Sequence, residues 1–274
     1  MRVVRCCVVG APIRHSRSPF IHRLFAEQFG LALRYDKREV GPGALAGVVA
    51  ELIGDGLRGI NVTIPLKEEA WALATRRSPR AAAAGAANVL SFEPDAAIEA
   101  DNTDGLGLVR DLAHHGVTLA GRRVLLLGAG GAARGIVPAL LEAGVARLFI
   151  ANRTPDKAAA LAAAFATPGR VKTLALAARC PEPVDLVINS TSAGLTSAAP
   201  PPVPAGALGA GTACHDLVYG SGETPFLRWA REQGVKLRID GLGMLVEQAA
   251  AAFARWHGLE PATLPVIEAL RRRL

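Results

Sequence analysis

The stretch Arg122–Gly135, RRVLLLGAGGAARG, decides the fold of this 274-residue chain. A run of apolar strand-forming residues ends at Gly128, and Gly130 and Ala133 complete the pattern G-x-G-x-x-G/A. The first glycine makes a tight turn, the second lets a pyrophosphate approach the backbone, and the small third residue lets the helix pack on the strand. The N-terminus of that helix offers free N–H groups to phosphate. The pattern therefore predicts a dinucleotide site formed by Gly128, Ala129, Gly130, Gly131 and Ala132.

The end of the next predicted strand indicates which dinucleotide is bound. Enzymes that use NAD usually carry Asp or Glu there, which holds the ribose 2′-hydroxyl. This chain instead reads Asn152-Arg153-Thr154, with Lys157 one turn later, and such cations and hydroxyls suit a 2′-phosphate. The sequence favours NADP over NAD. Thr154 before Pro155 also fits the N-cap of the following helix, a role that Arg153 does not have.

Short β-rich runs alternate with Ala- and Leu-rich helical stretches along the whole chain. This order predicts an α/β fold with mostly parallel sheets. The expected strands are 3–10, 34–40, 58–64, 124–128, 147–153, 184–190, 213–219 and 237–241. The expected helices are 19–29, 43–52, 67–74, 132–143, 155–165, 226–233 and 244–256.

The charge pattern favours small anionic ligands. The chain has 31 Lys and Arg against 24 Asp and Glu, a net charge of +7, but the basic residues are scattered and the only run is Arg271–Arg273. Nucleic-acid binding would favour a basic stripe with interleaved aromatic residues, so we expect no nucleic-acid partner. A positive field that gathers small anions explains the charge.

The same composition indicates a cytoplasmic chain. Half of the residues are hydrophobic, enough for a sizeable core, yet charges interrupt every apolar run before the roughly 20 residues that a membrane helix needs. The N-terminus does not read as a secretory signal. Four cysteines show no CxxC spacing, and Cys6 and Cys7 should point to opposite faces of one strand. The paired histidines lack ligand spacing, so no metal site is expected.

Three segments of the first half carry polar groups that could do chemistry: 10–22 (GAPIRHSRSPFIH), 59–69 (GINVTIPLKEE) and 100–107 (ADNTDGLG). Ser18 before Pro19 suits a helix N-cap, but Ser16 and Ser18 could equally present two hydroxyls to a carboxylate. Lys67 alone would be read as a solvated lysine, and Asp104 before a helical run as an N-cap.

Taken together in order, the motifs resemble those of the shikimate/quinate dehydrogenase family over nearly the full chain. They are GAPIRHSRSP, NVTIPLKEE, GAANVL (85–90), DNTDGLG, GAGGAARG, NRT, NSTSAGL (189–195), DLVYGSGETPFL (216–227) and DGLGMLVEQ (240–248). The resemblance implies an α/β fold of two domains with the active site in the cleft between them. A substrate-binding domain would span 1–103, completed by 241–274, and a doubly wound, Rossmann-type NADP domain would span 104–240.

The resemblance also implies the roles of individual residues. Lys67 and Asp104 would form the catalytic pair. The substrate would be held by Ser16, Ser18, Thr63, Lys67, Asn88, Asp104, Tyr219 and Gln248. Besides the glycine turn and the strand end, the cofactor would be held by Thr191, Leu217, Gly241 and Met244, with Asn189 and Ser192 near the nicotinamide.

The implied reaction is the reversible reduction of 3-dehydroshikimate to shikimate with NADPH, a step of the pathway to chorismate and the aromatic amino acids. Lys67 would donate the proton while Asp104 orients it. A quinate/shikimate dehydrogenase of broader scope and a non-catalytic NADP-binding sensor are the alternatives. Arg153 and Lys157 count against the first, whose members more often accept NAD, and the presence of Lys67 and Asp104 counts against the second. The expected partner is the small substrate, and the chain is expected to be a monomer or a homodimer.

Overall fold

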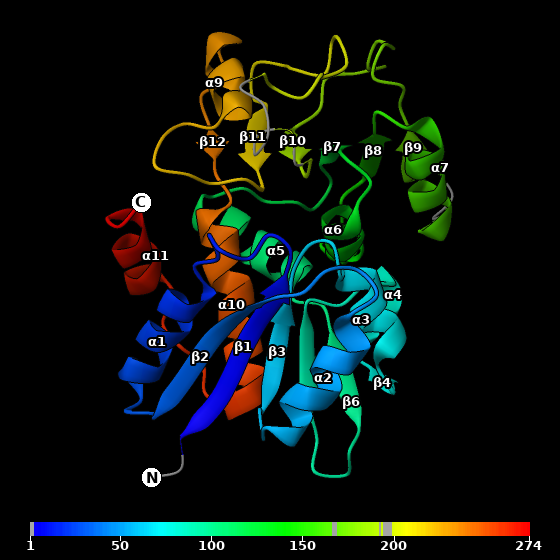
Figure 1. Ribbon diagram of the computed structural model, residues 1–274. Coiled ribbons are helices and arrows are strands. Elements are labelled where there is room, and N and C mark those ends of the chain that lie inside the picture. The colour runs from blue at the N-terminus through cyan, green and yellow to red at the C-terminus, as the bar shows by residue number, and fades with distance from the viewer. Residues whose placement is uncertain (1–2, 166–168, 192, 194–198) are drawn as a thin grey trace. The chain divides into compact units, whose positions relative to one another are not determined.

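The computed structural model describes residues 3–165, 169–191, 193 and 199–274. The chain divides into two compact units, one of residues 1–108 and 245–273 and one of residues 109–244 (Figure 1). Helix α5 (Asp104–His114) and helix α10 (Leu242–His257) each contribute residues to both units. The assignment of 1–103 with 241–274 to substrate and of 104–240 to cofactor stays a prediction.

The first unit is built on a mixed sheet of six strands in the order β2-β1-β3-β5-β6-β4. Its strands are β1 (Val4–Gly10), β2 (Leu33–Glu39), β3 (Gly59–Val62), β4 (Arg76–Arg77), β5 (Val89–Phe92) and β6 (Ile98–Asp101). β2, β1 and β3 run parallel, as predicted, whereas β5 runs antiparallel to its two neighbours, β3 and β6. The hairpin of β5 and β6 was not predicted. Its first strand begins inside the motif GAANVL (85–90), and its second ends at the first residue of the motif DNTDGLG (101–107), so the motifs mask the two short strands.

Helices cover both faces of this sheet. They are α1 (Ser18–Gln28), α2 (Leu45–Gly54), α3 (Lys67–Leu73), α4 (Pro79–Ala84), most of α10 and α11 (Leu264–Arg271). Cys7 packs in the core with Leu45 and Val49 of α2 and Ala70 of α3, while Cys6 packs with Ala252 and Trp256 of α10. The two neighbouring cysteines therefore face opposite sides of β1, as predicted, and each face of the sheet has its own apolar core.

All four cysteines are buried and free. Burial raises the pKa of the Cys6, Cys7 and Cys214 thiols to about 12, because a thiolate is poorly solvated there. These thiols act as small apolar core residues.

The second unit is a parallel sheet of six strands in the order β12-β11-β10-β7-β8-β9 (Figure 1). The strands are β7 (Arg123–Leu127), β8 (Arg147–Ala151), β9 (Val171–Thr173), β10 (Leu186–Asn189), β11 (Ala213–Asp216) and β12 (Arg238–Ile239). The helices besides α5 include α6 (Gly131–Glu142), α7 (Pro155–Ala164) and α9 (Pro225–Glu232). Strand order reverses at β7, and this doubly wound arrangement confirms the predicted Rossmann-type fold. In the described part of the chain, no helix has the length and apolar character needed to cross a membrane.

Candidate active site

Lys67 and Asp104 form a buried ion pair in the first unit. Lys67 opens α3 directly after the turn that follows β3, and Asp104 opens α5. The Lys67 Nζ lies 2.5 Å from Asp104 Oδ2. Their side chains are only 12% and 7% exposed, so the pair is shielded from bulk water. Lys67 is thus not a solvated surface lysine. The carboxylate of Asp104 accepts hydrogen bonds from the side chains of Lys67 and Asn88.

Asn88 joins this pair to the rest of the predicted substrate site. Its Nδ2 donates to Asp104 Oδ1 at 2.9 Å and lies 3.0 Å from Gln248 Oε1 and 2.9 Å from Thr103 Oγ1. Its Oδ1 accepts the backbone N–H of Thr103 at 2.8 Å. The structure therefore brings four predicted residues, Lys67, Asn88, Asp104 and Gln248, into one network of polar groups that can bind hydroxyls.

Ser16 and Ser18 lie side by side with their hydroxyl oxygens 3.3 Å apart. The N-cap reading of Ser18 is wrong, because α1 begins at Ser18 itself and its N-cap, Arg17, makes no side-chain capping bond. Pro19 accounts for the start of the helix, since its fixed φ suits the first turn. Ser16 Oγ accepts the backbone N–H of Ser18 at 3.3 Å, a long hydrogen bond, so the start of α1 makes little use of the two hydroxyls.

Thr63 and Tyr219 complete the predicted substrate residues. Thr63 follows β3, where its N–H donates to Val9 O at 2.9 Å. A Cβ at Gly10 would collide with its methyl group, so the close approach of β1 to this turn requires glycine. Tyr219 follows β11 in the second unit, partly buried.

The glycine turn has the geometry that a phosphate site needs. Gly128 has φ +106°, and a Cβ there would also meet Ser190 Oγ at 2.6 Å. Gly130 is the N-cap of α6, and a Cβ on it would meet no protein atom within 4 Å. No side chain caps α6 among the described residues, and its first turn, from Gly131, carries no acidic side chain. The N-terminus of α6 is thus open to an anion, and the turn fits a pyrophosphate.

The end of β8 is cationic and solvent-exposed. Arg153, Thr154 and Lys157 are exposed, and Asn152 donates from Nδ2 to Thr154 O at 2.9 Å. Thr154 stands at the N-cap of α7 but makes no side-chain capping bond, so its hydroxyl is not used by the helix. Within the described part of the chain, no ion pair engages Arg153 or Lys157. These groups fit a 2′-phosphate.

Asp216, at the end of β11, fixes the strand ends of the second unit. Its carboxylate accepts from Asn189 Nδ2 at 2.9 Å and from Thr224 Oγ1 at 2.6 Å. Asn189 Oδ1 in turn accepts from Thr191 Oγ1 at 2.7 Å. Burial raises the pKa of Asp216, because a carboxylate is poorly solvated in this position. Thr191 is therefore held at the end of β10, whereas Ser192 lies outside the described residues.

The remaining predicted cofactor residues follow the last two strands of the second unit: Leu217 comes directly after β11, and Gly241 and Met244 come after β12. A Cβ at Gly241 would collide with Leu217 O, and the Gly241 N–H donates to Val218 O at 3.2 Å. Glycine is required at position 241 because the backbone of the turn after β12 lies too close to the end of β11 for any side chain. Met244 is buried in the first turn of α10.

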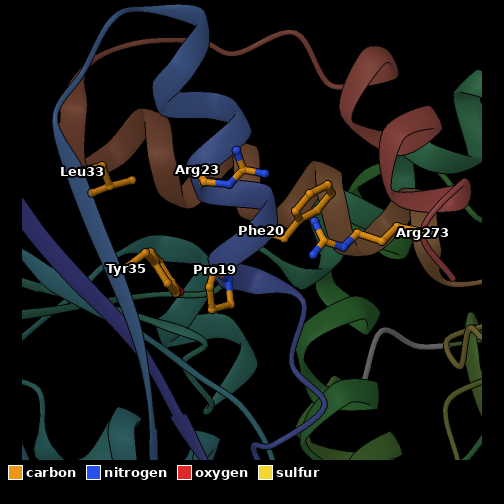
Figure 2. A pocket seen from close by; sticks show the side chains of 6 residues that line it. All are labelled: Pro19, Phe20, Arg23, Leu33, Tyr35 and Arg273. Carbon is orange, nitrogen blue, oxygen red and sulfur yellow. The ribbon is translucent and has the colours of Figure 1, made fainter.

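One pocket of about 400 Å³ lies elsewhere in the first unit (Figure 2). It is lined by Pro19, Phe20, Arg23, Leu33, Tyr35 and Arg273. The guanidinium carbons of Arg23 and Arg273 lie 5.2 and 4.6 Å from the centroid of the Phe20 ring. No predicted site residue lines it, so the pocket does not mark the Lys67–Asp104 group.

Sequence reasoning missed the residues that hold the predicted ones in place. Asp101 and Asn102 are fully buried or nearly so and support the turn that carries Asp104. Asn61, also buried, accepts from Tyr35 Oη at 2.6 Å and donates to Asn88 O at 3.3 Å. Asn61, Asp101 and Asn102 all fall inside the motifs quoted above. Only their contacts in the fold show that they support the site residues instead of lining the site themselves.

Comparisons with known families cover both units. The profile of the shikimate dehydrogenase substrate-binding domain matches residues 8–90, that of shikimate/quinate 5-dehydrogenase residues 111–197, and that of the shikimate 5'-dehydrogenase C-terminal domain residues 241–271. Shikimate dehydrogenase (NADP(+)) of Alkalilimnicola ehrlichii is 50% identical over 268 residues, which are 97% of this chain and 98% of that protein.

Solved structures agree. Shikimate 5-dehydrogenase from Thermus thermophilus, solved in complex with NADP(H) and shikimate, has a TM-score of 0.88 and 37% identity, covering 99% of this chain and 100% of that one. The ligand-free 5-ketofructose reductase of a Gluconobacter species has a TM-score of 0.87 at 28% identity, with full coverage (100%) of both chains. Since the fold alone accommodates other substrates, identity and matched domains carry the assignment. On both counts, this chain belongs to the shikimate dehydrogenase family.

Proposed function

We propose that the chain catalyses the reversible reduction of 3-dehydroshikimate to shikimate with NADPH. The observation that carries the proposal is the buried Lys67–Asp104 pair, 2.5 Å apart, with Asn88 and Gln248 beside it. A relative of 50% identity bears the name shikimate dehydrogenase (NADP(+)), and a relative of known structure binds NADP(H) and shikimate.

The substrate residues divide the work by chemistry. Ser16 and Ser18 donate hydroxyl hydrogens to the substrate carboxylate, which is remote from the reacting carbon. Thr63, Asn88, Asp104 and Gln248 bind the ring hydroxyls, because together they offer both donors and acceptors. Tyr219 is the remaining residue proposed to bind the substrate, through its hydroxyl.

Lys67 moves the proton. Reduction of the C3 carbonyl leaves a developing alkoxide, and the Lys67 ammonium donates a proton to that oxygen; in the oxidative direction the neutral amine accepts it. Asp104 holds the Lys67 Nζ in place and keeps it beside the ring hydroxyls. General acid–base help of this kind contributes roughly 10²–10⁴-fold to the rate.

The second unit binds NADPH, which supplies the hydride when bound. The open N-terminus of α6, with Gly128, Ala129, Gly130, Gly131 and Ala132, takes the pyrophosphate. Asn152, Arg153, Thr154 and Lys157 take the 2′-phosphate. Thr191, Leu217, Gly241 and Met244 line the nicotinamide end.

Two further properties are proposed with the activity. The chain works as a monomer or a homodimer, and it belongs to the reducing cytoplasm, where buried free cysteines remain thiols.

The experiment that tests the function follows absorbance of NADPH with purified protein. Shikimate, quinate and several other hydroxy acids are each offered with NADP and with NAD. We expect rapid reduction of NADP with shikimate alone. Turnover of quinate with NAD would instead support a quinate/shikimate dehydrogenase, and binding of NADPH without turnover of any acid would support a sensor.

A further inference from the structure

Asp101, the last residue of β6, is a buried carboxylate that the proposed reaction does not use directly. It is fully buried, with an exposed fraction of 0%. A carboxylate in such a place is costly unless cations and donors satisfy it. Two sets of groups donate to the Asp101 carboxylate or lie beside it. One set belongs to α4, its N-cap and α10, and the other belongs to the turn that leads to Asp104.

The helical side supplies the charge. Arg80 of α4 donates from Nε to Asp101 Oδ1 at 3.2 Å and from Nη2 to Oδ2 at 2.5 Å, the two-pronged geometry that a guanidinium offers a carboxylate. Ser78, which caps α4 by accepting from Ala81 N at 3.1 Å, donates its own hydroxyl to Asp101 Oδ1 at 2.5 Å. Arg255 Nη1 of α10 lies 3.6 Å from Oδ2.

The same carboxylate begins a chain of bonds to the catalytic aspartate. Asp101 Oδ1 accepts the backbone N–H of Asn102 at 2.7 Å. The side chain of Asn102 then accepts the N–H of Asp104 at 3.1 Å and donates to Ala86 O at 2.9 Å. The backbone carbonyl of Asp101 accepts the N–H of Asn88 at 3.1 Å. Asp101 therefore supports both Asp104, the ion-pair partner of Lys67, and Asn88, which donates to Asp104.

Its charge state agrees with this geometry. Burial alone would raise the pKa of Asp101, but hydrogen bonds from Arg80 and Ser78, with the charges of Arg80 and Arg255, lower it overall. The carboxylate is thus held ionised, with every donor fixed on a secondary-structure element or on the turn itself.

We propose that Asp101, anchored by Arg80, is a positioning residue that fixes the turn Asn102–Asp104 and thereby the placement of Asp104 and Asn88 around Lys67. The inference rests on the proposed function. Asp101 touches neither substrate nor cofactor in this account; it acts through Asn102 and the backbone. Because general acid–base chemistry tolerates little displacement, loosening the turn lowers the rate of the chemical step.

The test compares kcat of wild type, Asp101→Asn and Arg80→Ala at temperatures where each variant is folded. Asp101→Asn keeps the shape and removes the charge; we expect kcat to fall by about tenfold to a hundredfold while the Kd for NADPH is unchanged. Arg80, whose side chain is 47% exposed, gives a second route in case Asp101→Asn does not fold. The matched controls are Asp95→Asn and Arg76→Ala, which break an exposed ion pair in the same unit.

Chemical rescue separates positioning from simple support of the fold. Added methylguanidinium should restore kcat of Arg80→Ala, because it can occupy the vacated guanidinium site beside Asp101, and should not restore the double variant Arg80→Ala/Asp101→Asn. Kcat equal to wild type in both single variants would overturn the inference while leaving the function standing. Loss of kcat that methylguanidinium does not rescue would overturn it as well. A wild type without dehydrogenase activity would refute the proposed function instead.

Discussion

Ser16 and Ser18 illustrate how single residues divide between structure and function. The N-cap of the first helix, Arg17, makes no side-chain capping bond, and among the described residues the only bond from either hydroxyl to the backbone at the start of the helix is the long one that Ser16 Oγ accepts from the Ser18 N–H, at 3.3 Å. The two oxygens lie 3.3 Å apart, a spacing suited to the two oxygens of one carboxylate.

Ser16→Ala and Ser18→Ala should each raise the KM for shikimate by about one to two decades and change kcat little. A hydrogen bond to a charged group contributes about 1.5–3 kcal/mol, and a carboxylate remote from the reacting carbon is bound equally in ground and transition states. Steady-state kinetics gives both constants, and thermal unfolding gives the control: we expect Tm to change little, because the bond from Ser16 Oγ to the Ser18 N–H is long. A lowered Tm with an unchanged KM would mean that the hydroxyls serve the fold.

Arg153 is the residue that decides cofactor choice. It is exposed at the end of β8, and an arginine can bind a phosphate with two parallel hydrogen bonds and stack on the adenine. Wild type should therefore prefer NADP over NAD by about two decades or more in kcat/KM, which corresponds to about 1.4 kcal/mol per decade.

Arg153→Asp should reverse this preference, since the carboxylate repels the 2′-phosphate and accepts from the ribose hydroxyls of NAD. Lys172→Asp, on the exposed face of β9, makes the same change in net charge away from the strand end and is the control. Equal kcat/KM for both cofactors in wild type would contradict this role of Arg153.

At the scale of elements, α1 packs on β2 through a buried histidine. His22 is fully buried, its ring stacks on Tyr35 with centroids 4.3 Å apart, and both ring nitrogens lack hydrogen-bond partners among the described residues. Burial, with a smaller effect of His257, lowers the pKa of His22 to about 3. The neutral ring is therefore part of the apolar contact between α1, β2 and α10.

This burial makes stability depend on pH. Between about pH 6.5, where an unfolded histidine titrates, and the lowered folded pKa, the unfolded chain holds a proton that the folded chain does not. The free energy of unfolding therefore falls as pH drops below 6.5, by about 1.4 kcal/mol per pH unit for this group. His22→Phe keeps an aromatic ring on Tyr35 and removes the proton.

Urea unfolding of wild type and His22→Phe from pH 8 to pH 4.5 measures the effect. The curve of the variant should be flatter by the slope of one proton, about 1.4 kcal/mol per pH unit, whatever its absolute stability. Parallel curves for the two proteins would show that His22 does not account for the pH dependence.

Helices and strands were predicted correctly where the hydrophobic periodicity and the turn-forming residues indicate the same element boundaries. The glycine turn after β7 and the alternating β and α segments of the second unit follow a repeating local pattern, and the structure confirms the parallel sheet. The hairpin of β5 and β6 could not be found in this way. Its two strands of four residues each are antiparallel inside a unit whose other connections suggested parallel pairing. The two strands pair locally, with Phe92 opposite Ile98, but β5 also pairs with the distant strand β3, with Ser91 opposite Gly59, and such a contact leaves no local pattern in the sequence.

At the scale of the whole molecule, the sequence predicts the site better than it predicts what supports it. Lys67 and Asp104 are 37 positions apart in the sequence. Taken alone, Lys67 would be interpreted as a surface lysine and Asp104 as a helix N-cap. Their motifs marked them, but only folding shows that they are paired and buried. The family resemblance singled out Asp104 but gave no role to Asp101, although both are aspartates of one short motif. The role of Asp101 follows only from the groups that surround it in the fold.

The account as a whole depends on proton transfer by Lys67. Lys67→Ala removes the donor and should lower kcat by at least about two orders of magnitude, while the Kd for NADPH stays unchanged because the residues proposed to bind it lie in the other unit. Lys67→Arg keeps a positive charge beside Asp104 but cannot give up its proton near neutral pH.

The most direct measurement is kcat for shikimate oxidation by NADP in wild type, Lys67→Ala and Lys67→Arg, with the Kd for NADPH of each protein measured by fluorescence. We predict that both variants bind NADPH as wild type does and that both lose kcat by at least about two orders of magnitude. Near-normal kcat in Lys67→Ala would contradict the assignment of Lys67, and near-normal kcat in Lys67→Arg would show that charge alone, rather than proton transfer, is what the site requires.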